Sequence, residues 1–368
     1  MPLSSAKRPS GPRPRPASAP GRSRPELAAR AGNAVVPSPD ALVRPPDSED
    51  AVPTPAEAVD PPDPYAAPST RSSSRLTGLV RVARPRQWLK NLLVFVAPAV
   101  AGVLFHPHAL LRTLGAFGIF CLAASGAYFL NDSFDAEADR AHPVKRNRPI
   151  AAGVVPVAMG LEIGSALLAV SIALGLLLAG WHMAVVMVAY GAINVVYSLG
   201  LKNEPILDLA AVSSGFVLRA VAGGVAVGVP LSNWFLIVAS FGSLLIVTGK
   251  RSGEKRLLSD HLTDQAEVRQ TLGLYSVSFL QTVRTLSAAV SVTAYCLWAF
   301  ERASQVHPGH DPVWFQLTIV PFVIGLLHVV RLLDAGEGAA PEELAIHDHR
   351  LQIYGLVWIA LFAIGIYG

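Results

Sequence analysis

An amide and three carboxylates lie at the end of a long apolar segment, directly before a basic cluster: Asn131, Asp132, Asp135 and Asp139. On a helix, spacings of three and four residues place the carboxylates on one face, with neighbouring Cβ atoms about 5–6 Å apart. At an effective dielectric near 20, two unit charges at ~6 Å repel by roughly 2.8 kcal/mol, which a divalent cation relieves. Carboxylates, water and substrate phosphates suit Mg²⁺. The motif therefore predicts a site for a Mg²⁺-bound diphosphate; the alternative is a solvated acidic loop that caps a helix.

A second acidic pair, Glu204 and Asp208, follows a later apolar segment. Pro205 suits the first turn of a helix, where its missing N–H costs no hydrogen bond. Two carboxylate groups on different helices that converge at one membrane face are what bound Mg²⁺ ions need to hold a diphosphate between them. We therefore predict that the metal ligands, which are also the catalytic residues, are Asp132, Asp135, Asp139 and Asp208.

Basic and polar residues beside these motifs are candidates for substrate contacts, because a diphosphate requires cationic partners. Tyrosines at these positions also suit interfacial anchors. An arginine at mid-bilayer costs ~2.5–3.5 kcal/mol on insertion scales, so Arg219 should face a polar interior; a buried ion pair or a hydrogen bond between helices is the alternative. The predicted substrate-binding residues are Lys90, Tyr128, Asn131, Arg140, Lys145, Arg148, Tyr197, Lys202, Glu204, Arg219, Lys250 and Arg251.

The composition is that of an integral membrane protein. Of 368 residues, 52% are hydrophobic and 15% charged, and the mean hydropathy is +0.43, outside the usual range for a soluble globular protein. More than half of the 29 prolines precede residue 75. We therefore expect a disordered Pro/Ala/Arg-rich cytoplasmic tail over residues 1–74 and a membrane domain over 75–368. The net charge of +4 is a topological signal rather than evidence of nucleic-acid binding, and the oligomeric state, a homo-oligomer included, stays open.

Apolar runs near the ~20 residues needed to cross a bilayer predict an all-α bundle of nine transmembrane helices. The expected spans are residues 91–106, 110–131, 156–179, 182–200, 206–228, 232–249, 275–300, 314–333 and 351–367. Lys and Arg concentrate in alternate connections, beginning before the first span. Because basic residues favour the cytoplasmic side, we expect a cytoplasmic N-terminus, an outside C-terminus, and an active-site cavity open to the cytoplasmic side of the cell membrane.

The first motif, NDSFDAEAD, together with a second acidic motif two helices later, resembles the UbiA superfamily of intramembrane prenyltransferases. The family pattern is Asn-Asp-x-x-Asp-x-x-x-Asp, and it is intact from Asn131 to Asp139. The second motif departs from the commoner Asp-x-x-x-Asp, because Glu204 stands in the first acidic place. That departure argues against the aromatic prenyltransferases of the family.

Three stretches resemble the decaprenyl-phosphate phosphoribosyltransferase branch of this family: RPRQWLKN, NDSFDAEADRAHPVKRNRPIAAG and YSLGLKNEPILDL. The resemblance covers about residues 80 to 368. It implies transfer of a phosphoribosyl group from phosphoribosyl diphosphate to a polyprenyl phosphate in the membrane, which releases diphosphate and gives decaprenylphosphoryl-5-phosphoribose for cell-wall arabinan. Two alternatives stay open: a family member that uses a prenyl diphosphate donor with an aromatic or lipid acceptor, and a transporter of an anionic lipid or metabolite that uses Arg219 and Arg284.

Overall fold

The computed structural model describes residues 74–142, 144–260, 273–305, 311–337, 344 and 347–367. All of the described residues belong to one compact unit, Ala67–Gly368. The disordered tail predicted for residues 1–74 lies outside the described part, apart from Ser74, and stays a prediction.

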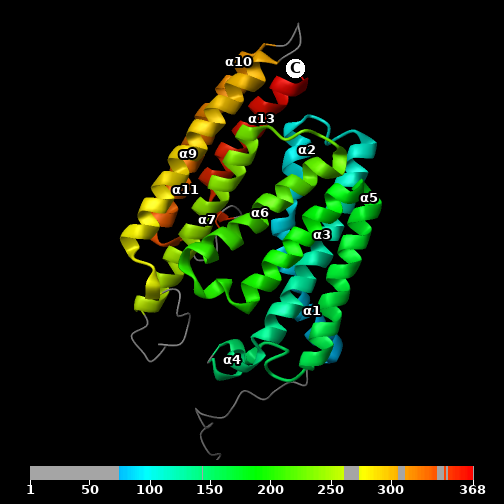
Figure 1. Cartoon of the computed structure of the whole chain (residues 1–368). Coiled ribbons are helices and arrows are strands. Elements are labelled where there is room, and N and C mark those ends of the chain that lie inside the picture. Colours follow the sequence, from blue (N-terminus) through cyan, green and yellow to red (C-terminus); the bar gives the residue numbers. More distant parts are fainter. Residues whose placement is uncertain are drawn as a thin grey trace, which may run out of the picture. The chain divides into compact units, whose positions relative to one another are not determined.

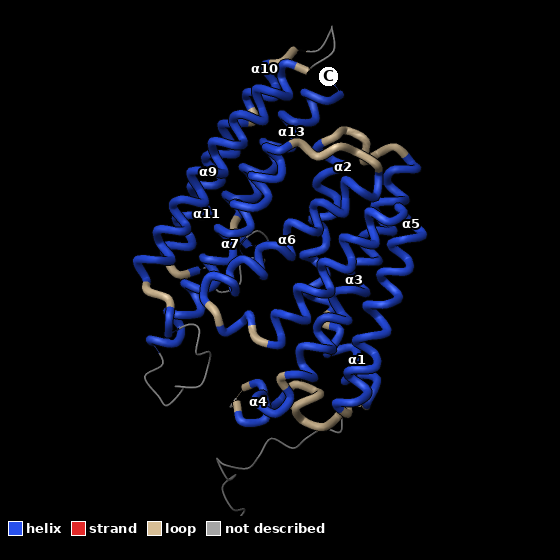
Figure 2. Tube along the Cα trace, in the orientation of Figure 1, coloured by secondary structure: helices blue, strands red, loops and turns tan. Residues whose placement is uncertain are grey.

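The described part of the chain is helical and contains no strand (Figures 1 and 2), which confirms the predicted all-α class. The elements, in chain order, are α1 (Arg75–Ala83), the 3₁₀ helix η1 (Pro85–Phe95), α2 (Val96–Val100), α3 (Pro107–Phe134), α4 (Ala136–Ala141), η2 (Lys145–Asn147), α5 (Val157–Leu199), η3 (Leu201–Asn203), α6 (Pro205–Val227), α7 (Asn233–Asp260), α9 (Val277–Ser304), α10 (Val313–Leu317), α11 (Ile319–Ala335) and α13 (His349–Tyr367).

Seven helical stretches in the described residues are long and apolar enough to cross a membrane: α3, α5, α6, α7, α9, α10 with α11, and α13. Large apolar side chains such as Leu177 and Leu327 point outward from them. In water such faces would cost free energy, whereas in a bilayer they contact lipid tails. The chain is therefore a multi-pass membrane protein, as its composition predicted.

Helix α5 is 43 residues long but is broken near its middle. Ala179 and Gly180 have non-helical dihedral angles, and Gly180 has a φ of 68°. A Cβ added to Gly191 would lie 3.7 Å from Cδ1 of Leu168, whereas a straight helix would separate these residues by about 35 Å. The two halves of α5 therefore run antiparallel, which matches the two segments that the sequence separates at residues 180–181.

The first expected span, residues 91–106, differs from the others. Its start lies in the 3₁₀ helix η1, which passes into the short helix α2 and ends at Val100. Asn91 and Pro98 in this stretch are buried against the bundle. The number of membrane crossings, nine by sequence, stays a prediction.

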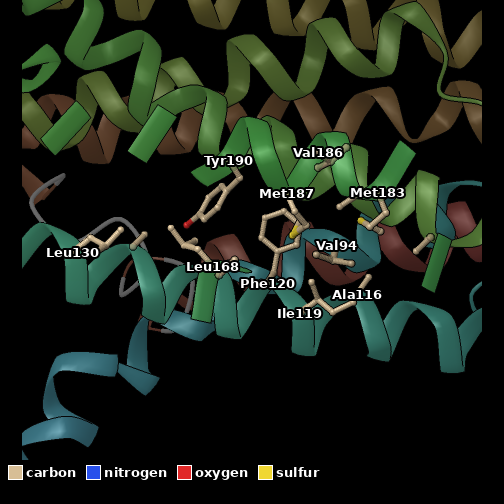
Figure 3. Packing of buried hydrophobic residues seen from close by; sticks show 14 residues of the cluster. Val94, Ala116, Ile119, Phe120, Leu130, Leu168, Met183, Val186, Met187 and Tyr190 are labelled. Carbon is tan, nitrogen blue, oxygen red and sulfur yellow. The ribbon is translucent and has the colours of Figure 1, made fainter. Parts of the chain in front are cut away.

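Among the four apolar clusters of the described residues, two contain the most buried side chains. The larger one joins η1, α3, α5 and α6 through residues such as Val94, Phe120, Met183 and Tyr190 (Figure 3). The other joins α9, α10 and α13 through aromatic side chains, with Trp298, Phe315 and Phe362 among them. Because the larger core fixes α3 against α5 and α6, the ends of these helices, where both acidic motifs lie, are held in register.

Candidate active site

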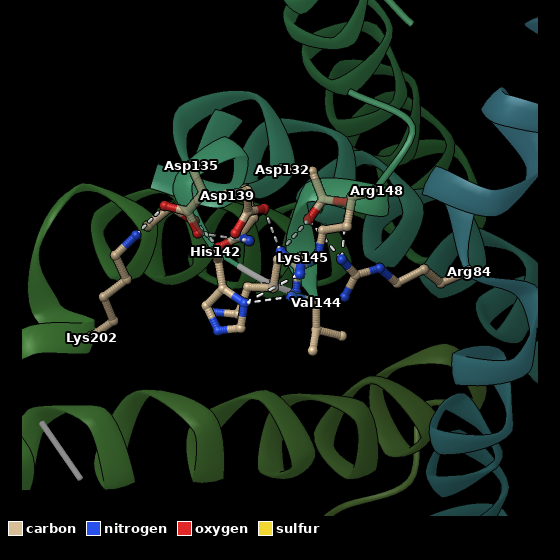
Figure 4. Close-up of polar contacts among 11 residues, drawn as sticks. Arg84, Asp132, Asp135, Asp139, His142, Val144, Lys145, Arg148 and Lys202 are labelled. Atoms are coloured by element: carbon tan, nitrogen blue, oxygen red, sulfur yellow. Dashed lines mark hydrogen bonds and ion pairs between the residues drawn. The ribbon is translucent and has the colours of Figure 1, made fainter. Parts of the chain in front are cut away.

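The first acidic motif spans the junction of two helices. Asn131 and Asp132 lie in the last turn of α3, Asp135 is the residue between α3 and α4, and Asp139 lies on α4. Asp135 has φ −87° and ψ 0°, and its N–H still donates to the carbonyl of Asn131 at 2.9 Å. The single continuous helix assumed from the spacing is therefore interrupted here, but the helical turn is kept and the three carboxylates stay close together (Figure 4).

Asp132 and Asp139 are buried and share one guanidinium partner, Arg148. Nη2 of Arg84 donates to both oxygens of Asp132 at 2.6 and 2.9 Å. Nη1 of Arg148 lies 3.3 Å from Oδ1 of Asp132 and 2.7 Å from Oδ2 of Asp139. The Arg84 guanidinium also stacks on Tyr128, 4.6 Å from its ring centre. A cationic nitrogen is thus already accommodated between two carboxylates (Figure 4).

Asp135 joins the first acidic motif to the connection that precedes the second. Its carboxylate forms an ion pair with Lys202 of η3 and accepts a hydrogen bond from Nδ2 of Asn131 at 3.3 Å. Ser198, near the end of α5, donates to Oδ1 of Asn131 at 3.0 Å. These contacts bring the connection between α5 and α6 against the end of α3, as the proposed convergence of the motifs requires.

Asp208 lies in the first turn of α6 and is the most completely surrounded of the four carboxylates. The Arg251 side chain of α7 donates to it from Nε and from Nη2, both at 2.7 Å. The hydroxyls of Tyr197 and Tyr275 lie 2.9 and 3.2 Å from its oxygens. Arg251 also pairs with Glu254 at 2.8 Å, so this buried guanidinium is shared between two carboxylates.

Burial raises the pKa of the Asp139 carboxyl above its usual value, and the nearby Arg148 guanidinium opposes that rise. A cation placed beside Asp139 favours the ionised form in the same way that Arg148 does. Asp139 is therefore a carboxylate whose ionised form is favoured by a cation beside it.

The donor set fits Mg²⁺ held jointly with a substrate. No group of three or more His, Cys, Asp or Glu side chains in the described residues is close enough to hold a metal ion alone. Mg²⁺ is usually bound through one or two carboxylates plus substrate phosphates. Asp132 and Asp139, which both contact Nη1 of Arg148, supply carboxylates at the required closeness.

The remaining predicted residues differ in their placement. Arg140 is exposed and donates from Nε to the carbonyl of Ala151 at 3.2 Å, and Glu204 is exposed at the start of α6. The side chains of Lys90 on η1, Lys145 on η2 and Lys250 on α7 are half-buried. Arg140, Lys145 and Glu204 lie in or beside the acidic motifs in the sequence, whereas Lys90 and Lys250 lie far from them along the chain. The roles of all five as substrate contacts stay predictions.

Arg219 is buried within the bundle, and protein groups accept from all of its terminal nitrogens. Nε donates to Asn91 at 2.7 Å, Nη1 to the carbonyl of Gly215 at 2.6 Å, and Nη2 to the hydroxyl of Tyr190 at 3.1 Å. These contacts fit the alternative of a hydrogen bond between helices. Arg284 likewise pairs with Asp334 of α11.

Arg84, Ser198, Tyr275 and Glu254 belong to the site but were not among the predicted site residues. Arg84 was detectable in principle, because it opens the RPRQWLKN stretch. Its φ is 50°, the sole positive φ at a non-glycine residue in the described chain. Nothing in the sequence predicts this backbone conformation at an arginine. Tyr275 follows a long connection, so its approach to Asp208 depends on tertiary structure.

Comparisons with known proteins identify the family. Residues 92–362 match the UbiA prenyltransferase family. The chain is 43% identical to decaprenyl-phosphate phosphoribosyltransferase of Corynebacterium glutamicum, over 79% of this chain and 87% of that protein. It is also 43% identical to the protein of the same name from Mycolicibacterium smegmatis, over 79% of this chain and 93% of that one.

Solved structures agree in fold. A UbiA homolog from Archaeoglobus fulgidus bound to GPP and Mg²⁺ superposes with a TM-score of 0.53 at 17% identity, covering 78% of this chain and 98% of that one. A digeranylgeranylglyceryl phosphate synthase superposes with a TM-score of 0.54 at 14% identity, covering 79% and 98%. With the acidic motifs at the ends of α3 and α5–α6, these matches lead to one conclusion: the chain belongs to the UbiA prenyltransferase family.

Proposed function

We propose that this protein transfers the 5-phosphoribosyl group of phosphoribosyl diphosphate to a polyprenyl phosphate, such as decaprenyl phosphate, and releases diphosphate. The observation that carries the proposal is the convergence of basic side chains from separate elements, Arg84, Arg148 and Lys202, on the carboxylates of one motif. Donor and acceptor are both anions, so a site that takes both needs more positive charge than the metal alone supplies. The relatives named decaprenyl-phosphate phosphoribosyltransferase support the same activity, and the product would serve arabinan synthesis in the cell wall.

In the proposed reaction the bond from the anomeric carbon of ribose to the diphosphate oxygen breaks, and a bond from that carbon to an oxygen of the lipid phosphate forms. Mg²⁺ bound to carboxylates among Asp132, Asp135, Asp139 and Asp208 would neutralise the leaving diphosphate. The acceptor phosphate is already anionic, so its oxygen needs no general base. The protein's main task is to hold two anions in line, and proximity supplies much of the rate.

Asp208 can take part only if one of its present contacts is released. A carboxylate offers about four lone-pair sites, and Arg251, Tyr197 and Tyr275 occupy them. Tyr275 has one hydroxyl hydrogen and a second acceptor, the carbonyl of Pro205. When that hydrogen is donated to Pro205, an oxygen of Asp208 is open to a metal ion.

The proposed topology has nine crossings. It counts the two halves of α5 separately and treats η1 with α2 as the first span. With a cytoplasmic N-terminus and an outside C-terminus, both acidic motifs lie at a cavity on the cytoplasmic side of the cell membrane, where phosphoribosyl diphosphate is the soluble substrate. The basic connections around η2 and η3 support this orientation.

The test is diphosphate release by purified protein given phosphoribosyl diphosphate, decaprenyl phosphate and Mg²⁺. Release should require all three components and be lost in Asp135→Asn. Glu137→Gln is the matched control, because Glu137 is an exposed acidic residue two positions further on and should keep wild-type activity. If diphosphate is released from a prenyl diphosphate but not from phosphoribosyl diphosphate, the proposal is rejected in favour of prenyl transfer. If neither donor releases diphosphate, a transporter is favoured.

A further inference from the structure

We propose that Arg84, Arg148 and Lys202 are exchangeable counter-ions, which neutralise the first acidic motif until metal and diphosphate enter and then turn to the phosphate oxygens. The inference rests on the proposed function and adds a second task for these residues. It also separates them from Arg251, which stays with Asp208 throughout.

The exposure of the partners supports this division. The side chains of Arg84, Arg148 and Lys202 are 29%, 29% and 25% exposed, whereas those of Asp132 and Asp139 are 2% and 4% exposed. Each of these cations therefore reaches a carboxylate from the solvent side and can withdraw into water.

Arg251 is only 4% exposed, and Asp208, its partner, is 2% exposed. Withdrawing its guanidinium would leave a charge in a low-dielectric interior, which is strongly unfavourable. Arg251 is therefore a permanent partner that holds α6 against α7.

Competition for the same lone pairs makes the exchange necessary. Oδ1 of Asp132 accepts from Nη2 of Arg84 and from Nη1 of Arg148, and a carboxylate oxygen has about two lone-pair sites. The guanidinium groups must therefore leave this oxygen before a metal ion can use it. The same nitrogen of Arg148 joins Asp132 to Asp139, so its departure frees one lone pair on each of these carboxylates.

The displaced groups stay close enough to serve the substrate. The Arg84 guanidinium is stacked 4.6 Å from the centre of the Tyr128 ring, a contact that does not involve a carboxylate and holds a cation in place. Guanidinium groups bind phosphate in a bidentate manner. The exchange therefore replaces carboxylate–guanidinium pairs by carboxylate–metal and guanidinium–phosphate pairs, and no buried charge is left alone.

The experiment measures binding of Mn²⁺, as a paramagnetic probe for Mg²⁺, to purified full-length protein by electron paramagnetic resonance. Arg84→Gln removes a competitor, so its Kd for Mn²⁺ alone should fall at least about tenfold, the worth of one charge-assisted hydrogen bond. Arg81→Gln removes the same charge from an exposed position in α1 and should leave Kd unchanged. Arg84→Lys keeps a competing cation and should stay close to wild type.

A second arm adds inorganic diphosphate. Diphosphate should strengthen Mn²⁺ binding more in the wild type than in Arg84→Gln, because the wild type has two released guanidinium groups to contact it, those of Arg84 and Arg148, whereas the variant keeps only that of Arg148. A Kd for Mn²⁺ in Arg84→Gln equal to or above that of the wild type would overturn the exchange. Arg84→Lys binding as tightly as Arg84→Gln would also overturn it.

If Arg84→Gln does not fold, Lys202→Gln tests the same exchange at Asp135, since that pair is the most exposed of the three. Neither arm uses phosphoribosyl diphosphate. If the proposed function is wrong, the purified protein will not release diphosphate from phosphoribosyl diphosphate, but the Mn²⁺ affinities will still differ between variants as expected. If the exchange is wrong, diphosphate will be released and the expected differences in Mn²⁺ affinity will be missing.

Discussion

At the scale of single residues, the ion pairs of the site differ chiefly in burial. The side chains of the Lys202–Asp135 pair are 25% and 21% exposed, so water screens both charges in part, and ion pairs in contact with water contribute little to stability. The Arg251–Asp208 pair is buried and extensively hydrogen-bonded. Loss of one partner of a buried pair leaves an uncompensated charge, which costs far more than loss of an exposed partner.

Arg251→Gln should therefore lower the free energy of unfolding by about 3–5 kcal/mol. Lys202→Gln should lower it by about 1 kcal/mol or less. Denaturant unfolding in detergent micelles, monitored by intrinsic fluorescence, measures both. Equal losses in the two variants would contradict the distinction between permanent and exchangeable cations.

Arg219→Leu tests whether the buried arginine acts on structure or on substrate. The variant loses hydrogen bonds to η1, α5 and its own helix α6, so its Tm should fall and total activity should fall with the folded fraction. For the protein that remains folded, KM for phosphoribosyl diphosphate should be unchanged. A raised KM with an unchanged Tm would instead place Arg219 in contact with a substrate phosphate.

At the scale of elements, glycines let helices approach where the site is assembled. A Cβ on Gly223 of α6 would lie 1.9 Å from the carbonyl oxygen of Val94 in η1, a contact with backbone that cannot rotate away. Helix packing in membranes depends on such small residues, because apolar side chains gain little by leaving lipid. Gly223 therefore sets the position of η1, and with it the position of Asn91.

Gly223→Ala should displace η1 from α6 and cost at least about 1–3 kcal/mol, as overpacking does. Gly118→Ala on α3 is the matched control, since its Cβ would meet no atom within 4 Å. Thermal unfolding of both variants in the same detergent measures the difference. A Tm of Gly223→Ala equal to that of Gly118→Ala would show that η1 shifts without cost.

The turn inside α5 gives a second test at this scale. Gly180 has φ 68° and ψ −161°, a region that is essentially restricted to glycine and costs other residues about 1–3 kcal/mol. Gly180→Ala should therefore be destabilised by that amount. Gly242 lies inside helix α7 and has open space where its Cβ would be, so Gly242→Ala is the matched control and should lose no stability.

At the scale of the whole molecule, the number of crossings decides where the C-terminus lies. If η1 with α2 crosses the membrane and α5 crosses twice, the count is nine and the termini lie on opposite sides. If η1 with α2 stays at one surface, the count is eight and the termini lie on the same side. The 3₁₀ geometry of η1 makes this segment the decisive one.

We expect alkaline phosphatase fused after Gly368 to be active outside the cell, and green fluorescent protein fused at the same place to remain dark. A second phosphatase fusion, after Phe105, should also be active, because the connection between α2 and α3 would lie outside. The opposite pattern after Gly368 would exclude nine crossings with a cytoplasmic N-terminus.

The class, the family resemblance and the two acidic motifs could all be predicted from the amino-acid sequence alone. Apolar runs indicate membrane helices because the bilayer sets their length. The spacing of Asp132, Asp135 and Asp139 indicates a shared face because a helical turn is local geometry. Both signals depend on neighbours in the chain, so both could be detected without a structure.

The pairing of each cation with its carboxylate could not be predicted from the sequence, because it depends on how the helices pack. Arg84 and Asp132 are 48 residues apart in sequence, and Arg251 and Asp208 are 43 apart, so their pairing depends on how η1, α3, α6 and α7 pack. The local pattern placed Arg219 in a polar interior but could not choose among its possible partners. The charge pattern along a chain indicates which groups need a partner of opposite charge, but long-range packing determines which partner each group meets. The same packing sets how deeply each cation is buried, and burial distinguishes the exchangeable cations from the permanent one.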